Sequence, residues 1–388
     1  MILSHRIQLD PTVKQTVAFN KAAGCARYTW NWAVQEWEKT WHETGKSPNV
    51  NELKRKWNSC KPAWVYESPK DANQQPFGNL QKAYRAYFKK TAKKPHLKTK
   101  RKSRASFYVS NDKFKLLGNR VKLPKIGWVR MTEELRFVGR VVSATVSRTA
   151  DRWFIAVQVD TVTAEKPGTE CIGMDLGLKH FATLSTGEVI DAPKPLKRSL
   201  DKLRRLSRQH SRKQSGSKNR SKCAMRLARH HARVACIRKD FLHKVTTSLV
   251  SKAKTLVIED LSVQGMQRLW GRAVSDAGLY ECRRQLTYKC QKTGVALVLA
   301  DRWYPSTQLC SGCGARQKLG LADRTYQCHC CGMTKDRDLN AALNLSTVGY
   351  TGIQACGQEG SDWKHVFLVK PSWMKQELNL ATSTSCHK

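Results

Sequence analysis

The spacing of hydrophobic residues divides the first part of the chain into one extended and several helical stretches. Residues 2–9 alternate between apolar and polar positions and predict a strand that ends at Asp10-Pro11. Over residues 12–44, 51–60 and 76–90, apolar side chains recur at helical spacing, with aromatic residues on the same stripe. We therefore expect an opening strand followed by a small helical segment.

A basic run separates these helices from a region of β character. Residues 89–104 (KKTAKKPHLKTKRKSR) are almost all cationic or polar and predict a linker that does not pack. Residues 105–160 alternate in the manner of strands, with turn signals between the runs. A small, strongly basic β-barrel or sheet fits this pattern, and residues 2–9 could add its first strand. EKPG at 165–168 predicts a further linker.

The second half combines short apolar runs with helices. Residues 170–190 (ECIGMDLGLKHFATLSTGEVI) predict a strand, a turn and a second strand. Residues 196–250 predict a long basic helical region, and its break at QSGSKNRSK is typical of a hairpin. Residues 254–258 predict a buried strand. The Ala-rich stretch DLNAALNL, beginning at Asp338, predicts a helix, and because the pattern fades after it we expect a disordered tail over 348–388.

The charge balance indicates a protein that binds polyanions. The 388 residues include 70 Lys and Arg against 30 Asp and Glu, giving a formal net charge of +40, and a field of this sign recruits nucleic acid. A basic membrane binder is the rival class, but the charge is spread over the whole chain and no run of about 18 apolar residues occurs. The N-terminus shows no secretory signal, so we expect a cytoplasmic, nucleoid-associated protein with no membrane partner.

Cysteine spacing predicts one metal site. Cys310 and Cys313, then Cys328 and Cys331, form two CxxC pairs, each followed by glycine, which is the spacing of a four-cysteine Zn²⁺ ribbon. Cys330 also lies within the second pair, so a Cys328/Cys330 pair stays open, although one intervening residue is a poor geometric match. Four thiolates leave no open position on Zn²⁺, so the site is structural and the chemistry must come from elsewhere.

Three acids stand where predicted strands end or a helix begins: Asp175, Glu259 and Asp338. Mg²⁺ and Mn²⁺ prefer oxygen ligands, and two such ions can hold the attacking water and the leaving oxygen of a phosphodiester. We therefore predict a divalent-metal site built from these carboxylates. The alternative for any single acid is a helix cap or a surface ion pair, and Asp336 could be the N-cap of the helix that contains Asp338.

Several of these motifs together resemble the transposon-encoded TnpB proteins, relatives of the compact type V CRISPR effectors. The matching motifs, in order, are IGMDLGLKHFATLS, DFLHKVTTSLV, LVIEDLSV, CSGCG, YQCHCCG and DRDLNAALNL. The resemblance covers about residues 1–345 and is densest over 170–345. It implies an α/β fold plus a β-barrel: a RuvC-like, RNase H-type nuclease domain with an inserted zinc ribbon, preceded by a β-barrel wedge domain that carries a helical recognition insert.

The resemblance also implies domain boundaries and catalytic roles. It identifies Asp175, Glu259 and Asp338 as the three RuvC acids and leaves Asp336 as a neighbour that is not a ligand. The implied domains are the wedge domain at 1–10 and 105–165, the helical insert with its basic linker at 11–104, the nuclease domain at 166–304 and 336–347, and the zinc ribbon at 305–335.

The function implied by the resemblance is RNA-guided cutting of double-stranded DNA beside a short target-adjacent motif, with Mg²⁺ or Mn²⁺ in a single nuclease site. The partners would be a guide RNA derived from the transposon end and the target DNA. Two alternatives stay open: a guide-bound, non-cleaving DNA-binding repressor, and a guide-free zinc-ribbon accessory of transposition. The intact set of three acids favours the nuclease.

Candidate nucleic-acid contacts fall into two sets. In the helical insert, the candidates for reading the target-adjacent motif are Phe77, Gln81, Tyr84 and Arg85, although Phe77 and Tyr84 could be core residues. The basic runs 89–104 and 197–238 are expected to bind phosphates, because each neutralised phosphate releases a counterion. Their candidate residues are Lys100, Arg101, Lys102, Arg104, Arg205, Arg208, Arg229 and Arg233.

Overall fold

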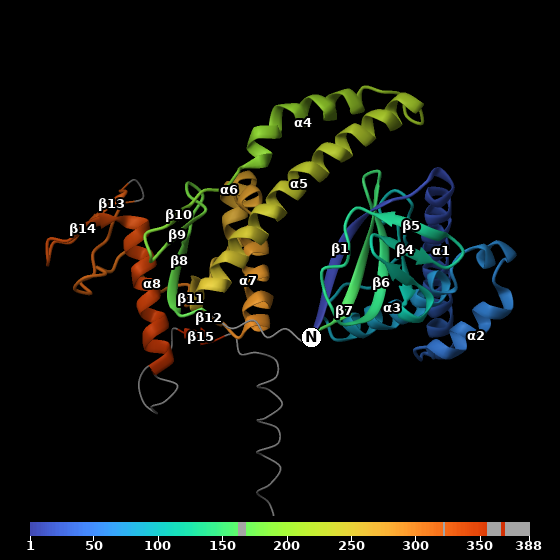
Figure 1. Ribbon diagram of the computed structural model, residues 1–388, viewed down its shortest axis with the longest axis horizontal. Coiled ribbons are helices and arrows are strands. Elements are labelled where there is room, and N and C mark those ends of the chain that lie inside the picture. The colour runs from blue at the N-terminus through green and yellow to red at the C-terminus, as the bar shows by residue number, and fades with distance from the viewer. Residues whose placement is uncertain (162–167, 321–322, 355–365, 369–388) are drawn as a thin grey trace, which may run out of the picture. The chain divides into compact units, whose positions relative to one another are not determined.

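The chain divides into two compact units, Met1–Val162 and Thr163–Lys388. The computed structural model, drawn in Figure 1, describes residues 1–161, 168–320, 323–354 and 366–368. Each unit has its own sheet and its own hydrophobic core. None of the helices in the described ranges is long and apolar enough to cross a membrane.

An antiparallel sheet of seven strands, in the order β2-β6-β7-β1-β5-β4-β3, forms the first unit. The strands are β1 (Ile2–Asp10), β2 (Ser106–Ser110), β3 (Lys115–Leu117), β4 (Arg120–Leu123), β5 (Gly127–Met131), β6 (Arg140–Thr149) and β7 (Arg152–Asp160). The opening strand does join the later ones, because β1 pairs with both β7 and β5. No pairing between the edge strands β2 and β3 is present among the described residues, so the structure shows a sheet and no closed barrel.

Three α-helices accompany this sheet. They are α1 (Val13–Thr44), α2 (Val50–Cys60) and α3 (Lys70–Phe88), with short 3-10 turns at Ala63–Glu67 and Asn111–Lys113. A reciprocal capping box between Thr12 and Gln15 starts α1, and Gly45 ends it in the left-handed conformation that glycine adopts without strain. The predicted third helix is longer than its apolar stripe, because it begins at Lys70 and tolerates Pro76 in its second turn.

The second unit is built on a sheet in the order β10-β9-β8-β11-β12-β15. The strands are β8 (Glu170–Leu176), β9 (Ala182–Leu184), β10 (Val189–Ile190), β11 (Ala253–Glu259), β12 (Ala296–Ala300) and β15 (Val366–Leu368). Strands β8, β11 and β12 run parallel, whereas the others pair antiparallel to their neighbours. The carboxyl ends of the three parallel strands therefore meet at one edge of the sheet.

Helices cover both faces of this sheet (Figure 1). Leu256 and Ile258 of β11 pack with α5 (Lys218–Lys252), α6 (Val263–Ala277) and α7 (Leu279–Thr293) on one face. Val257, which points the other way, packs with Leu345 of α8 (Arg337–Gln354) on the opposite face. The predicted basic hairpin is confirmed: α4 (Pro195–Ser211) precedes α5, and the two helices contact each other. The zinc-ribbon region adds the hairpin of β13 (Thr325–Gln327) and β14 (Thr334–Asp336).

The chain after residue 347 contains more structure than its sequence pattern indicates. Helix α8 continues to Gln354, and β15 pairs with β12 near the edge of the sheet. The expected disordered tail over 348–388 is therefore wrong for residues 348–354 and 366–368. Its other residues, 355–365 and 369–388, lie outside the described residues.

Replacing Gly173 with alanine is expected to separate α8 from the sheet. A Cβ atom at this position would lie 2.1 Å from the carbonyl oxygen of Ala342 and 2.5 Å from the backbone nitrogen of Ser346. Both are backbone atoms of α8, so the helix must move, and overpacking of this kind costs about 1–3 kcal/mol or more. We expect a lower midpoint of thermal unfolding, measured by circular dichroism.

The matched control is Gly271→Ala, a glycine inside α6 whose added Cβ would meet no atom within 4 Å. Alanine is favoured over glycine within a helix by about 0.5–1 kcal/mol, so this variant is expected to be as stable as the wild type or slightly more so. Equal stability of the Gly173→Ala protein and the control would show that β8 and α8 do not approach each other as closely as described.

Candidate functional site

Two of the three acids lie side by side at the carboxyl edge of the parallel strands. Asp175 is near the end of β8, and Glu259 is the last residue of β11. Ile258 is the register partner of Met174. Asp175 and Glu259 come directly after these two residues, so they occupy adjacent positions on neighbouring parallel strands. Strand alternation places both on the face that α8 covers, because Gly173 and Val257, two residues before each acid, contact that helix.

The third acid is brought to this face by α8. Asp338 lies in the first turn of the helix and is half-buried. Asp336 plays a different part, because its Oδ1 accepts hydrogen bonds from the backbone N–H groups of Asp338 (2.9 Å) and Leu339 (3.1 Å). It therefore acts as the N-cap, the alternative that its position allowed, and it is exposed to solvent.

The charges of these acids interact. The pKa of Asp175 is raised to about 8, mainly by burial and also by the negative charges of Glu259 and Asp338, while Arg337 opposes the shift. Burial also raises the pKa of Glu259, against a hydrogen bond from Ser306. Carboxylates that disfavour each other's ionisation are stabilised by a cation placed between them. A bound cation would therefore favour the ionised form of Asp175, the acid whose pKa is raised to about 8.

The donor set of this acid group fits a hard divalent cation, since it consists of carboxylate oxygens. Among the described residues, one group of three or more possible metal ligands has all its ligand atoms within 4.8 Å of one another, and it consists of Cys310, Cys313, Cys328 and Cys331. The three carboxylates together do not meet that limit.

A network of buried polar side chains connects Glu259 to α8. The hydroxyl of Ser306, a residue only 2% exposed, donates a hydrogen bond to Glu259 Oε1. The carbonyl of Ser306 accepts one from Asn344 Nδ2 at 2.7 Å. Asn344 and Asn340, one helical turn apart, both donate to the carbonyl of Leu309, at 2.8 and 2.6 Å. The segment that enters the zinc ribbon is therefore fixed on the helix that carries Asp338.

Sequence reasoning missed this network. Its signal is the pair of asparagines at i and i+4 in DLNAALNL, since two amides on one face of an Ala-rich helix are costly to bury without partners. Asn340 is fully buried, and its Oδ1 also accepts from the backbone N–H of Ser311 at 2.9 Å. A partner segment in extended conformation could have been expected on that face of the helix.

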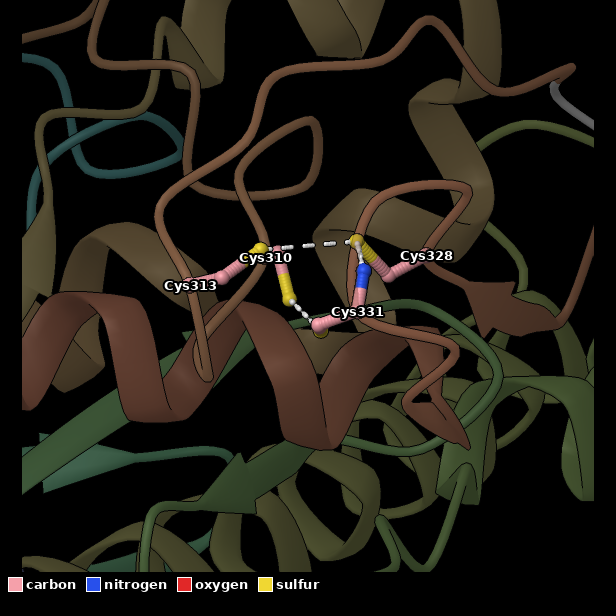
Figure 2. Close-up of side chains that lie close together, drawn as sticks. All are labelled: Cys310, Cys313, Cys328 and Cys331. Atoms are coloured by element: carbon pink, nitrogen blue, oxygen red, sulfur yellow. Dashed lines mark hydrogen bonds between the residues drawn. The ribbon is translucent and has the colours of Figure 1, made fainter.

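The four cysteines chosen from their spacing converge on one point, as Figure 2 shows. Cys310 Sγ lies 3.6 Å from Cys331 Sγ, and Cys313 Sγ lies 3.6 Å from Cys328 Sγ. Sulfurs at the corners of a tetrahedron around Zn²⁺ would stand about 3.8 Å apart, given a Zn–S distance of about 2.3 Å. The cluster therefore fits a structural zinc ion, and the exposed Cys330 is not one of its members.

Backbone groups prepare this cluster for metal. The N–H groups of Cys331 and Cys330 donate to Cys328 Sγ, at 3.5 and 3.4 Å. Together with hydrogen bonds from the Cys313 and Cys310 thiols they lower the pKa of the Cys328 thiol to about 6, against the effect of burial. Gly314 and Gly332, each after a CxxC pair, adopt positive φ angles of 75° and 70°, which a glycine allows without strain. The two tight knuckles thus follow directly from the CxxCG pattern.

The four candidates for nucleic-acid contact in the helical insert differ in their exposure to solvent. Phe77 and Tyr84 are 1% and 4% exposed, and they pack with Trp37 and Trp57 in the core of α1–α3. They are core residues in this structure, so their assignment to nucleic-acid contact is corrected. Arg85 is exposed and Gln81 half-buried, so these two side chains remain available.

The basic candidates all lie on the surface. Lys100, Arg101, Lys102 and Arg104 are exposed in the segment after α3, and Arg205, Arg208, Arg229 and Arg233 are exposed on α4 and α5. The segment containing the first set does pack, contrary to expectation, because Asn31 exchanges two hydrogen bonds with the backbone of Lys98, at 3.0 and 2.7 Å. The ammonium of Lys98 also stands 3.6 Å from the centre of the Trp30 ring.

Three protein-family profiles match parts of the chain. OrfB_IS605, described as “Probable transposase”, matches residues 154–269, and a Cas12f1-like TNB domain matches residues 280–345. A helix-turn-helix domain of the same OrfB_IS605 group matches residues 1–46. In the structure, this last range holds the strand β1 and the single long helix α1.

Relatives align along nearly the whole chain. A protein of Streptomyces pristinaespiralis, named “Putative RNA-guided DNA endonuclease”, is 36% identical over 387 residues, covering 96% of this chain and 95% of the relative. The protein InsQ of Escherichia coli strain K12 carries the same description and is 32% identical, covering 91% and 93% of the two chains. A “TnpB-like protein” of Acanthamoeba polyphaga mimivirus is 30% identical over 195 residues, 46% of this chain and 37% of that one.

The fold is also similar to that of a solved structure. The protein chain in a cryo-EM structure of a Cas12f1-sgRNA-target DNA complex aligns with a TM-score of 0.56, over 84% of this chain and 82% of that chain. The sequence identity of the two chains is 14%, so the comparison concerns the fold alone.

Proposed function

Since this chain belongs to the TnpB family of transposon-encoded proteins, the OrfB_IS605 group, we propose that it is an RNA-guided endonuclease that cuts double-stranded DNA beside a short target-adjacent motif. The description of its relatives as RNA-guided DNA endonucleases and the Cas12f-like fold support this proposal. In it, the first unit contains the wedge domain and its helical recognition insert, and the second contains a RuvC-like nuclease domain with the ribbon at 305–335.

The observation that carries the nuclease activity is the meeting of three acids at one edge of the sheet. Asp175 and Glu259 occupy adjacent positions on neighbouring strands, and α8 contributes Asp338. The charges of Glu259 and Asp338 raise the pKa of Asp175. The remainder of the chain carries a large excess of positive charge. A cluster of half-buried carboxylates in such a chain is costly unless a cation compensates it.

Each residue has a defined role in the proposed reaction. Asp175, Glu259 and Asp338 would hold Mg²⁺ or Mn²⁺, which supply an activated water and stabilise the charge that develops on the scissile phosphate. Ser306 fixes the orientation of the Glu259 carboxylate through its hydrogen bond. The Asp336 cap and the two ribbon-bound asparagines fix the first turn of α8 and hence the backbone of Asp338.

Guide RNA and target DNA are the proposed polyanionic partners. The exposed cations of α4 and α5 and of the segment after α3 would contact phosphates, and Gln81 and Arg85 are the remaining candidates for reading the target-adjacent motif. Base pairing with the guide would select the target, while the protein contacts the backbones and the short motif.

The proposal is tested by expressing the protein together with the DNA that flanks its gene and sequencing the RNA that copurifies. The purified complex is then incubated with plasmids that match the variable segment of this RNA and carry randomised positions beside the match. We expect Mg²⁺-dependent double-strand cuts in a subset of plasmids sharing one motif. A bound guide without any cut would favour the repressor alternative, and the absence of a defined RNA would favour the guide-free accessory.

Ser306→Ala is expected to slow cleavage about tenfold or more, because hydrogen bonds to charged groups contribute about 1.5–3 kcal/mol. The substitution removes the donor to Glu259 but leaves the Ser306 carbonyl, and therefore the Asn344 contact, in place. The cleavage rate measured over a range of Mg²⁺ concentrations should show an increased metal requirement.

Ser311→Ala is the matched control, since the hydroxyl of Ser311 in the same segment donates to the sulfur of Met333 at 3.7 Å. This variant is expected to cleave like the wild type. If both alanine variants cleave at the wild-type rate, Ser306 does not orient Glu259 during the reaction.

A further inference from the structure

The loop after β12 exposes a large aromatic side chain on a rigid backbone. Trp303 is 82% exposed. Its backbone N–H donates to Asp301 Oδ1 at 2.8 Å, and the N–H of Tyr304 donates to the Asp301 carbonyl at 3.0 Å. Exposed indoles are unfavourable in water. A single exposed aromatic side chain is common on protein surfaces, so the significance of Trp303 depends on where its loop lies.

The residues beside Trp303 are anchored to the acid site. On one side, Arg302 donates from Nε to the carbonyl of Asp260 at 3.2 Å and from a terminal nitrogen to its Oδ2 at 3.3 Å. On the other side, the hydroxyl of Tyr304 donates to the carbonyl of Asn344 at 3.2 Å. The loop thus bridges the residue that follows Glu259 and the helix that carries Asp338.

The register of the sheet places the start of the Trp303 loop beside Glu259. Ala300, the last residue of β12, is the register partner of Glu259, and the chain returns to Glu259 at Ser306. Trp303 is the middle one of the five residues between Ala300 and Ser306. The residues on both sides of this loop, Ala300 and Ser306, are thus neighbours of Glu259.

We propose that Trp303 is a stacking platform for one base of the DNA strand bound at the acid site, an inference that rests on the proposed function. The half-exposed guanidinium of Arg302 is adjacent, and the chain has a net charge of +40, so the surroundings suit a polyanion. Stacking on an aromatic ring tolerates any base, as a nuclease that takes its sequence choice from a guide requires. The base would be unstacked from its neighbour on that side, because its face must be free for the ring.

Photocrosslinking tests the contact directly. The guide-containing complex of the Asp175→Asn variant is bound to target DNA in which 5-iodouracil replaces thymine at successive positions of each strand. It is irradiated, and the crosslinked residue is identified by mass spectrometry. We expect a crosslink to Trp303 at one or two adjacent positions of a strand. In the cleavage-competent protein, Trp303→Ala and Trp303→Leu should cut about tenfold more slowly, whereas Trp303→Phe, which keeps an aromatic face, should cut nearly as well as the wild type.

The variants and the probe separate failure of this inference from failure of the proposed function. Wild-type cleavage rates for Trp303→Ala and Trp303→Leu, together with no crosslink at Trp303, would overturn the stacking role while leaving guided cleavage intact. If the wild-type complex never cuts, a crosslink between Trp303 and a single-stranded iodouracil oligonucleotide still supports a stacking site and places the failure with the nuclease. Unchanged melting temperatures, expected for an exposed side chain, verify that the variants are folded.

Discussion

Replacing Asp175 with asparagine is expected to abolish DNA cleavage while guide and target binding persist. The substitution keeps the shape of the side chain but removes the negative charge that the proposed metal ligand supplies, at a position on which the charges of Glu259, Asp338 and, most weakly, Asp336 act. Metal-assisted stabilisation of the transition state is worth several kcal/mol, so we expect the cleavage rate to fall about a thousandfold or more. The rate is measured on guide-matched plasmid, and binding is measured by filter retention of the same DNA.

The matched control is Asp336→Asn, two residues before Asp338. Asp336 accepts the N–H groups of the first turn of α8, and asparagine caps helices about as well as aspartate. This variant is expected to retain cleavage. The account is contradicted if Asp336→Asn is as inactive as Asp175→Asn, or if Asp175→Asn still cuts. Because the pKa of Asp175 is raised, the neutral asparagine should not lower the stability of the metal-free fold.

Replacing Cys328 with serine is expected to release the zinc ion and to inactivate the protein. A structural zinc site contributes about 10–16 kcal/mol of apparent binding energy in small zinc domains, so losing one of four ligands unfolds the ribbon. The ribbon segment holds Asn340 and Asn344 of α8, and its loss would free the end of the helix that presents Asp338. We expect about one zinc per chain in the wild type and none in Cys328→Ser.

Cys330→Ser is the control for this experiment, because the Cys330 thiol is exposed and outside the four-sulfur group. It should keep its zinc and its activity. Limited proteolysis adds a second readout: cleavage within 305–335 should appear in Cys328→Ser alone. Retention of zinc by Cys331→Ser together with its loss from Cys330→Ser would show that the second knuckle uses the shorter pair.

Much of the architecture could be predicted because local patterns determine it. Helical spacing of apolar residues, strand alternation and CxxCG spacing are properties of short segments, and they predicted α1, most strands and the cysteine knuckles. The convergence of Asp175 and Glu259 could also be expected, since both end apolar strands and the carboxyl ends of parallel strands meet at one edge.

The features that could not be predicted depend on which helices and strands pack against one another. Local sequence patterns do not determine this packing. Closure of the first sheet would require pairing of its edges β2 and β3, about which alternation contains no information. Phe77 and Tyr84 occupy a helical stripe that would look the same facing a core or a ligand, and their burial follows from α1 and α2 packing on that side. Lys98 packs against Trp30 because its long aliphatic stem can cover an aromatic face, although its run of charges indicated a solvated linker.

Whether a guide RNA selects the DNA target can be tested by reprogramming the guide. The variable segment of the copurifying RNA is replaced by an unrelated sequence, the complex is reassembled, and cleavage is mapped on a plasmid that carries the old and the new target beside the same short motif. We predict a Mg²⁺-dependent cut at the new target instead of the old one. The Asp175→Asn variant should cut neither target. A cut that stays at the old target, that ignores the RNA, or that survives the loss of Asp175 would contradict this prediction.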